Sequence, residues 1–392
     1  MVRSVYLDHS ATTPVRLEVS ELMQQYLRNK FGNPSSLHSY GRQARQGLNW
    51  AREQAAEAIG ANPTEILFTS GGTEADNLAI LGTAYAYQDR GRHIITSCIE
   101  HHAVLDSCKY LEKRGFRVTY LPVNEYGEVD LTELDRVLDD DTILISIMHA
   151  NNEIGTIQPI AEIGRRAQER SIPFHTDAVQ SLGKVPIDVK QLGVSLLSAS
   201  AHKIYGPKGA GMLYIRKGSR LDPLWHGGSQ EQKIRPGTEN VAGIVGLGRA
   251  VELAIAEMES VAGRINRLRD RLWEEIQTRI SAVKLNGHPS QRIPGHLNIS
   301  FVGLEGQSLL TALDEKGIAA SSGSACMAGA IEPSHVLQAI GLSADQVQGS
   351  IRLTLGRDNT HQELDYVLEE LPRLVEQLRG PGWNGPTCPC EG

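Results

Sequence analysis

Short apolar runs that alternate with amphipathic segments are the feature of this sequence that most constrains its fold. The runs are four or five residues long, and most are separated by a segment with helical periodicity. Nearly continuous apolar runs are typical of strands buried on both faces, as in a mainly parallel sheet. We therefore predict an α/β fold with a doubly wound sheet. The predicted strands are Ile66–Thr69, His93–Thr96, Val118–Leu121, Ile143–Ile147, Pro173–Thr176 and Leu196–Ala199.

The chain length indicates more than one domain. Its 392 residues exceed the length at which a single hydrophobic core stops growing. A large α/β domain is predicted over residues 16–255, and a smaller α+β domain over residues 1–15 together with 256–379. Near their boundary, apolar residues recur at helical spacing between Ser260 and Ile280, which predicts a helix there. Residues 380–392 are rich in turn-forming residues and are expected to form a flexible tail.

Composition and charge exclude several classes of function. The net charge is −7 and there is no long basic run, so a nucleic-acid-binding surface is not indicated. No apolar stretch approaches the roughly 20 residues that span a bilayer, and the N-terminus does not read as a signal peptide, so we expect a cytoplasmic protein without membrane attachment. The five cysteines are irregularly spaced and odd in number, which argues against a disulfide framework.

Lys203 is the first candidate for chemistry. It follows an apolar strand and precedes three glycines, Gly206, Gly209 and Gly211, that allow close backbone approach. A lysine presented into a cleft at a strand's end loses solvation, and this lowers its pKa and makes the amine a usable nucleophile. Taken alone, a surface lysine is the commoner interpretation.

Two further strand ends carry polar residues that fit the same site. Asp177 closes a strand and can hold a pyridinium nitrogen protonated, which makes a pyridoxal ring an electron sink; it can equally be a helix N-cap. Gly72 and Thr73 open a helix after another strand, where free backbone N–H groups and the threonine hydroxyl form a phosphate cup. The alternative there is an ordinary glycine turn with a capping residue.

His101 is interpreted as a cofactor-facing imidazole. Adjacent histidines such as His101 and His102 do not point the same way on a strand or a helix, and no HExxH or CxxC motif is present, so a metal site is not indicated. An imidazole that stacks on a flat ring and handles protons fits the neighbouring motifs better. A hydrogen-bonded loop histidine remains the alternative.

Cys326 and Arg352 are candidates for contact with a substrate. Cys326 lies in a run of small residues, 319–330, which predicts a mobile loop with an accessible thiol; a buried small residue is the alternative. Arg352 lies in a short strand predicted at 351–355, where its guanidinium could capture a carboxylate through two hydrogen bonds. It could also be an ordinary outward-facing residue of that strand.

Together these motifs resemble those of the cysteine desulfurases, in particular the housekeeping and nitrogen-fixation group. The resemblance runs from Tyr6–Pro14 to Gly356-Arg357, and its most specific motif is Ser322–Cys326, which marks the group with a long cysteine loop. It implies pyridoxal-phosphate-dependent fold type I, which is class-V aminotransferase-like, with a mainly parallel sheet in the large domain and a smaller α+β domain.

The resemblance also implies roles for individual residues. Lys203 binds the cofactor pyridoxal 5'-phosphate covalently, Asp177 pairs with the pyridine nitrogen, and Gln180 contacts the phenolic oxygen. His101 stacks on the ring and acts in catalysis, and Cys326 receives the sulfur as a persulfide and could transiently ligate a cluster, although no resident metal is expected. Residues expected to bind the phosphate are Gly72, Thr73, Ser200, His202 and Thr238, the last from the partner subunit of a homodimer. Asn152 and Arg352 are expected to hold the substrate carboxylate, and Asn152 also to contact the cofactor.

The implied reaction converts L-cysteine to L-alanine. Sulfur then passes to an acceptor or scaffold protein for iron–sulfur cluster assembly or other sulfur-containing products. Selenocysteine lyase, cystine lyase and aminotransferase activities are alternatives on the same fold, whereas a non-enzymatic scaffold is disfavoured because Lys203 and Asp177 are both present. The Cys388-Pro389-Cys390 tail departs from the family pattern. Its two thiols are either incidental or form a sulfur relay or a metal-binding pair.

Overall fold

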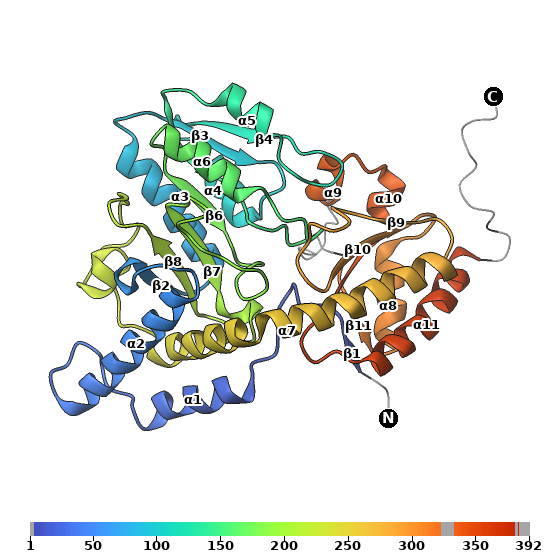
Figure 1. The fold of residues 1–392 in the computed structure, drawn as a ribbon, viewed down its shortest axis with the longest axis horizontal. Helices are drawn as coiled ribbons and strands as arrows, with labels where there is room; N and C mark the ends of the chain where they lie inside the picture. The colour runs from blue at the N-terminus through green and yellow to red at the C-terminus, as the bar shows by residue number, and fades with distance from the viewer. Residues whose placement is uncertain (1–3, 323–332, 381–382, 384–392) are drawn as a thin grey trace.

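The computed structural model describes residues 4–322, 333–380 and 383. They form a larger and a smaller part, each built around its own sheet and connected by one long helix (Figure 1). The large sheet has seven strands in the order β2-β8-β7-β6-β5-β3-β4, and β8 is antiparallel to both neighbours while the other pairs are parallel. The strands are β2 (Ile66–Thr69), β3 (His93–Ser97), β4 (Arg117–Leu121), β5 (Thr142–Ser146), β6 (Phe174–Asp177), β7 (Leu196–Ser200) and β8 (Gly211–Ile215).

Both faces of this sheet are buried, which explains the continuous apolar runs. Successive residues point to opposite faces: Phe68 and Ile95 pack with one group of helices, whereas Leu67 and Ile94 pack with another. The first face is covered by α2 (Ser39–Glu57), α6 (Ile160–Glu169) and the first half of α7 (Val241–Arg279), and the second by α3 (Gly72–Tyr87) and α4 (His102–Glu112). The predicted α/β fold with its mainly parallel sheet is confirmed. Strand β8 was not predicted, because it begins inside the glycine-rich segment after Lys203.

The helix predicted at 260–280 is the second half of a longer one, α7. Its N-terminal half contains Gly246 and Gly248, which lower helix propensity and obscured its start in the sequence. Both are needed for packing: a Cβ at Gly246 would lie 2.7 Å from Met23 Sδ, and one at Gly248 would lie 2.7 Å from Ala51 Cα in α2. The first half of the helix therefore packs closely on the large part, and the second half contributes Ile265, Leu268, Leu272 and Ile276 to the core of the small part.

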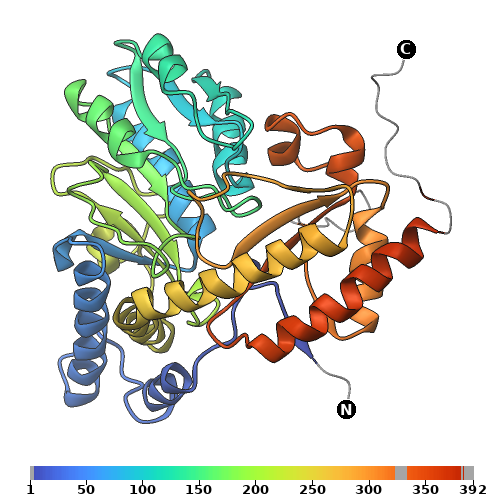
Figure 2. The ribbon, with the colours of Figure 1, turned by 45° about the vertical axis from the view of Figure 1, so that its right-hand side comes forward.

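The small part contains a three-stranded antiparallel sheet of β9 (Val283–Leu285), β10 (His296–Phe301) and β12 (Ser350–Thr354), in the order β12-β10-β9. Figure 2 shows the second half of α7 beside α11 (His361–Arg379), and both helices contribute apolar side chains to the core with β10 and α8 (Gly306–Glu315). Strand β1 (Val5–Tyr6) pairs in parallel with β11 (Ile318–Ala319). This pairing supports our proposal that residues 1–15 and 256–379 form one domain. The remaining α-helices of the described residues are α1 (Leu17–Arg28), α5 (Leu131–Val137), α9 (His335–Ala339) and α10 (Ala344–Gln348).

Most of the predicted tail, including Cys388 and Cys390, lies outside the described residues. Within the described part of the chain, no helix combines the length and apolar character needed to cross a bilayer.

Candidate active site

A cavity of about 370 Å³ lies where the carboxyl ends of β2, β3, β5, β6 and β7 meet at one edge of the large sheet. Open α/β sheets bind ligands at this edge. The N-terminal segment contributes Ser10 and Ala11 to the lining, and the small part contributes Ser321 and Arg352. Ten of the predicted site residues line this one cavity: Gly72, Thr73, His101, Asn152, Asp177, Gln180, Ser200, His202, Lys203 and Arg352.

The Lys203 amine is held by the N-terminal segment. Lys203 ends the short 3₁₀ helix η2 (Ala201–Lys203) after β7, and its Nζ donates to the backbone oxygens of Ser10, at 2.6 Å, and Ala11, at 2.7 Å. Burial, and then the charge of Arg352, lower the pKa of Lys203 to about 8. The uncharged amine, which is the form that attacks a carbonyl or accepts a proton, is therefore far more populated near neutral pH than in an ordinary lysine.

Asp177 and Gln180 line the same cavity as the Lys203 amine. Asp177 ends β6, is buried, and accepts a hydrogen bond from the Val179 N–H at 2.8 Å. Its pKa is raised by burial, so a cationic ring nitrogen would be a favourable partner for this carboxyl group. Gln180 Nε2 donates to Ser10 O at 2.9 Å, so Gln180 and Lys203 share one backbone acceptor.

The start of α3 forms the anion-binding end of the site. Thr73, Ser200 and His202 line both the main cavity and an adjoining one that Lys208 also borders. The first N–H groups of the helix lack partners within the helix, which favours an anion here. A Cβ at Gly72 would lie 2.6 Å from Val179 Cγ2, so this helix start packs directly against the segment after Asp177. Lys208 adds a cation that we did not predict.

His101 is the N-cap of α4, and its Nδ1 accepts a hydrogen bond from the Ala103 N–H at 3.1 Å. Burial lowers its pKa, so the ring is favoured as a neutral imidazole with its proton on Nε2. Groups of three or more histidine, cysteine, aspartate or glutamate side chains that could hold a metal ion are not found in residues 4–322 and 333–380.

Arg352 reaches the cavity from the small sheet and is buried. Its Nη1 donates to Asn152 O at 2.9 Å and its Nη2 to Asp8 Oδ1 at 2.8 Å. The buried Nε has no hydrogen-bond partner among the described residues. A cation with an unused donor in a partly closed cavity suits a carboxylate ligand.

Two predicted residues are not placed in this cavity. Thr238 is exposed and lines a separate surface cavity with Trp225, Arg235 and Glu74. Cys326 lies outside the described residues; Ser321, five positions before it, lines the main cavity and pairs with Arg352 through the backbone.

Seven lining residues had no predicted role: Ser10, Ala11, Asp76, Met148, Ala150, Val179 and Ser321. Asp76 lies three positions after Thr73 in α3, and this spacing places both on one face of the helix. That spacing could have indicated from the sequence that Asp76 lines the site. Its pKa is raised by burial and by the nearby Asp177, so its neutral form is favoured. Ser10 and Ala11 act through backbone oxygens, for which the sequence carries no signal.

These groups fit pyridoxal phosphate. An amine of lowered pKa suits the aldehyde, a buried carboxyl group suits the ring nitrogen, and a helix start with hydroxyls and Lys208 suits the phosphate. The cavity volume is within the range of small-molecule sites.

Comparison with known proteins identifies a family of similar sequence and fold. The family model described as "Aminotransferase class-V" matches residues 5–367. The chain is 56% identical to a cysteine desulfurase IscS from Dictyoglomus turgidum, over 97% of this chain and 96% of that protein. It is 58% identical to a cysteine desulfurase IscS from Methanosarcina thermophila, over 96% and 93%. Among solved structures, a "NifS-like protein" superposes with a TM-score of 0.90 at 40% identity, covering 95% of this chain and 99% of that one. A structure described as "SspA in complex with cysteine" superposes with a TM-score of 0.81 at 39% identity, covering 91% and 100%. With the family model spanning both parts of the fold and the cavity between them, this chain belongs to the class-V aminotransferase family.

Proposed function

We propose that this protein is a pyridoxal-phosphate-dependent cysteine desulfurase, which converts L-cysteine to L-alanine and passes the sulfur to an acceptor through a persulfide on Cys326. The observation that carries the proposal is the convergence of Lys203, Asp177, Gln180 and Arg352 on one cavity. The two cysteine desulfurase relatives named above match nearly the whole chain.

Each residue has a role that follows from its contacts. When bound, pyridoxal phosphate supplies an aldehyde that condenses with amines and a ring that accepts electrons. Lys203, with its lowered pKa, accepts and returns protons near the substrate Cα. Asp177 keeps the ring nitrogen protonated, and Arg352 with Asn152 orients the substrate carboxylate.

The sulfur is transferred by thiol chemistry on this chain. The Cys326 thiolate attacks the substrate sulfur, an S–S bond forms, and the Cβ–S bond of L-cysteine breaks. The carbon skeleton gains a proton at Cβ and leaves as L-alanine, so the overall reaction needs no external oxidant. In the sequence, Cys326 follows the cavity-lining residue Ser321 by only five positions, which supports its assignment as the sulfur acceptor.

We also propose that the active unit is a homodimer in which Thr238 completes the phosphate site of the partner. Thr238 is exposed outside this chain's own cavity. The segment before it is anchored to the large part: Glu231 is buried and accepts from the Phe68 N–H at 2.8 Å and from Arg52. Phe31, Leu37 and Trp225 are 65%, 83% and 46% exposed, a degree of apolar exposure that suits an interface.

Incubation of the purified protein with pyridoxal phosphate, L-cysteine and a reductant tests the activity. We expect sulfide and alanine in equal amounts. Pyruvate in place of alanine would indicate a lyase, and amino-group transfer to an added 2-oxo acid without sulfide would indicate an aminotransferase. We further propose a cytoplasmic location and an acceptor protein that assembles iron–sulfur clusters or other sulfur-containing products.

A further inference from the structure

Lys184 is a half-buried cation beside the active site with no role in the reaction described above. It follows Gly183, which adopts a left-handed conformation at φ 70°. A Cβ at Gly183 would lie 2.8 Å from Ala254 Cβ in α7, so only glycine allows this close approach. The turn directs the Lys184 side chain inward, between the large part and α7.

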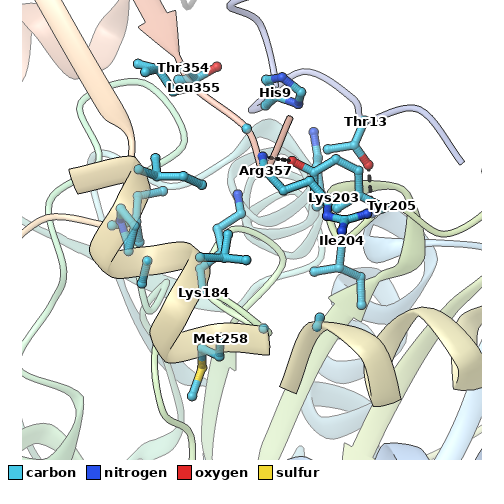
Figure 3. A pocket seen from close by; sticks show the side chains of 18 of the residues that line it. His9, Thr13, Lys184, Lys203, Ile204, Tyr205, Met258, Thr354, Leu355 and Arg357 are labelled. Atoms are coloured by element: carbon cyan, nitrogen blue, oxygen red, sulfur yellow. Dashed lines mark hydrogen bonds between the residues drawn. The ribbon is translucent and has the colours of Figure 1, made fainter. Parts of the chain in front are cut away.

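The Lys184 side chain enters a second cavity, of about 70 Å³, which lies behind the active site. Ser10 and Lys203 line both cavities. Figure 3 shows the Lys184 and Lys203 side chains extending toward the N-terminal segment that carries His9. Although Glu257 lines the same cavity, no ion pair between Lys184 and a carboxylate is found in the described part of the chain. A salt bridge therefore does not explain why the cation is there.

The hydrogen-bond partner of Lys184 is the active-site residue Gln180. Lys184 Nζ donates to Gln180 Oε1 at 3.3 Å, while Gln180 Nε2 donates to Ser10 O at 2.9 Å. An ammonium group has only donors, so it fixes which end of the amide is the oxygen. One N–H of Nε2 is then used by Ser10 and the other is left for the cavity that Gln180 lines.

We propose that Lys184 is a positioning residue for the reaction: it holds the Gln180 amide so that the NH₂ group faces the phenolic oxygen of the cofactor. This inference rests on the proposed function. A cation at the amide oxygen also polarises the amide and strengthens its N–H groups as donors. Burial and the charges of Lys203 and Arg352 lower the pKa of Lys184 to about 7.

A double-variant cycle on the holoenzyme tests the inference. The readout is the pH midpoint at which the visible absorbance of the bound cofactor changes, measured for wild type, Lys184→Met, Gln180→Ala and the double variant. Without a donor at the phenolic oxygen, negative charge there is less stabilised, so the neighbouring proton is lost at higher pH. We expect Lys184→Met to raise the midpoint by about one pH unit. We expect Gln180→Ala to raise it at least as much, and the double variant to match Gln180→Ala alone.

Three matched variants separate positioning from other effects. Lys184→Arg keeps the cation and its donors and should restore the wild-type midpoint, and Lys284→Met, at an exposed position in β9, should leave it unchanged. If Lys184→Met does not fold, Lys184→Ala, which also lacks a donor, takes its place with the same expected non-additivity. Additive shifts in the double variant, or an unchanged midpoint in Lys184→Met, would overturn the inference about Lys184 and leave the proposed function standing. A wild-type chain without any cofactor absorbance would refute the proposed function as well.

Discussion

Asp8 and Arg352 lie 344 positions apart in the sequence and form an ion pair at the active site, with Arg352 Nη2 at 2.8 Å from Asp8 Oδ1. The N-terminal segment therefore holds the guanidinium that we propose binds the substrate carboxylate. Asp8 fixes one edge of the guanidinium, and the Asn152 backbone oxygen fixes another at 2.9 Å.

Arg352→Ala is expected to raise the KM for L-cysteine by roughly 10- to 100-fold, because a hydrogen-bonded charge pair contributes about 1.5–3 kcal/mol. Arg352→Lys should recover part of this, since a lysine supplies the charge without the planar pair of donors. Steady-state kinetics on the holoenzymes measure both effects. Arg373→Ala, on an exposed face of α11, is the control, and an unchanged KM in Arg352→Ala would contradict the assignment.

Lys203 is expected to be the attachment site of the cofactor, because it lines the main cavity, which Lys184 does not, and because its pKa is lowered to about 8. Borohydride reduction of the holoenzyme, followed by peptide mapping, should place a pyridoxyl group on Lys203, and Lys203→Ala should carry no covalent label. Lys184, the other half-buried lysine nearby, is the internal comparison. A label there in the wild-type protein would refute the assignment.

The apo chain is expected to lose stability as the pH falls below 6.5. His149 and His175 are buried, and burial lowers their pKa values from 6.5 to about 4 and about 3. The unfolded chain therefore binds more protons than the folded chain between these values and 6.5, and each histidine costs up to about 1.4 kcal/mol per pH unit there. Urea unfolding between pH 7 and 4.5 measures the slope.

His149→Gln should flatten this dependence, while the exposed His361→Gln should not. An equal slope in wild type and His149→Gln would show that His149 is not held neutral in the folded chain.

Mixing two inactive variants tests the proposed shared site. If Thr238 acts in the partner's site, a dimer of one Lys203→Ala chain and one Thr238→Ala chain regains one site with both residues. We expect Thr238→Ala alone to be severely impaired and the mixture to recover part of the activity. A fully active Thr238→Ala enzyme, or an active monomer in sedimentation, would rule this arrangement out.

The sequence was sufficient to predict which residues line the main cavity for ten of its positions, for a physical reason. Asp177 and Lys203 follow strands whose apolar runs are recognisable, and the carboxyl ends of parallel strands meet at one edge of a sheet. The groups that were missed act through long-range contacts. Ser10 contributes a backbone oxygen, and Asp8 forms an ion pair with Arg352, near the other end of the chain. Lys184 reaches Gln180 because the chain turns at Gly183. No local pattern encodes such pairings.

The extent of α7 was missed for a related reason. Glycines that disfavour an isolated helix are tolerated in α7 because α1 and α2 pack against them, and this packing outweighs the local propensity.

Formation of a persulfide on Cys326 tests the central claim most directly. Wild type and Cys326→Ala holoenzymes are mixed with L-cysteine in the absence of reductant, and alanine and the sulfur content of each cysteine peptide are measured by mass spectrometry. Wild type should form one alanine for each sulfur added to Cys326. Cys326→Ala should still change its visible absorbance on addition of L-cysteine but form neither product, and Cys98→Ala should behave as wild type. Sulfide release by Cys326→Ala at the wild-type rate would contradict the desulfurase mechanism.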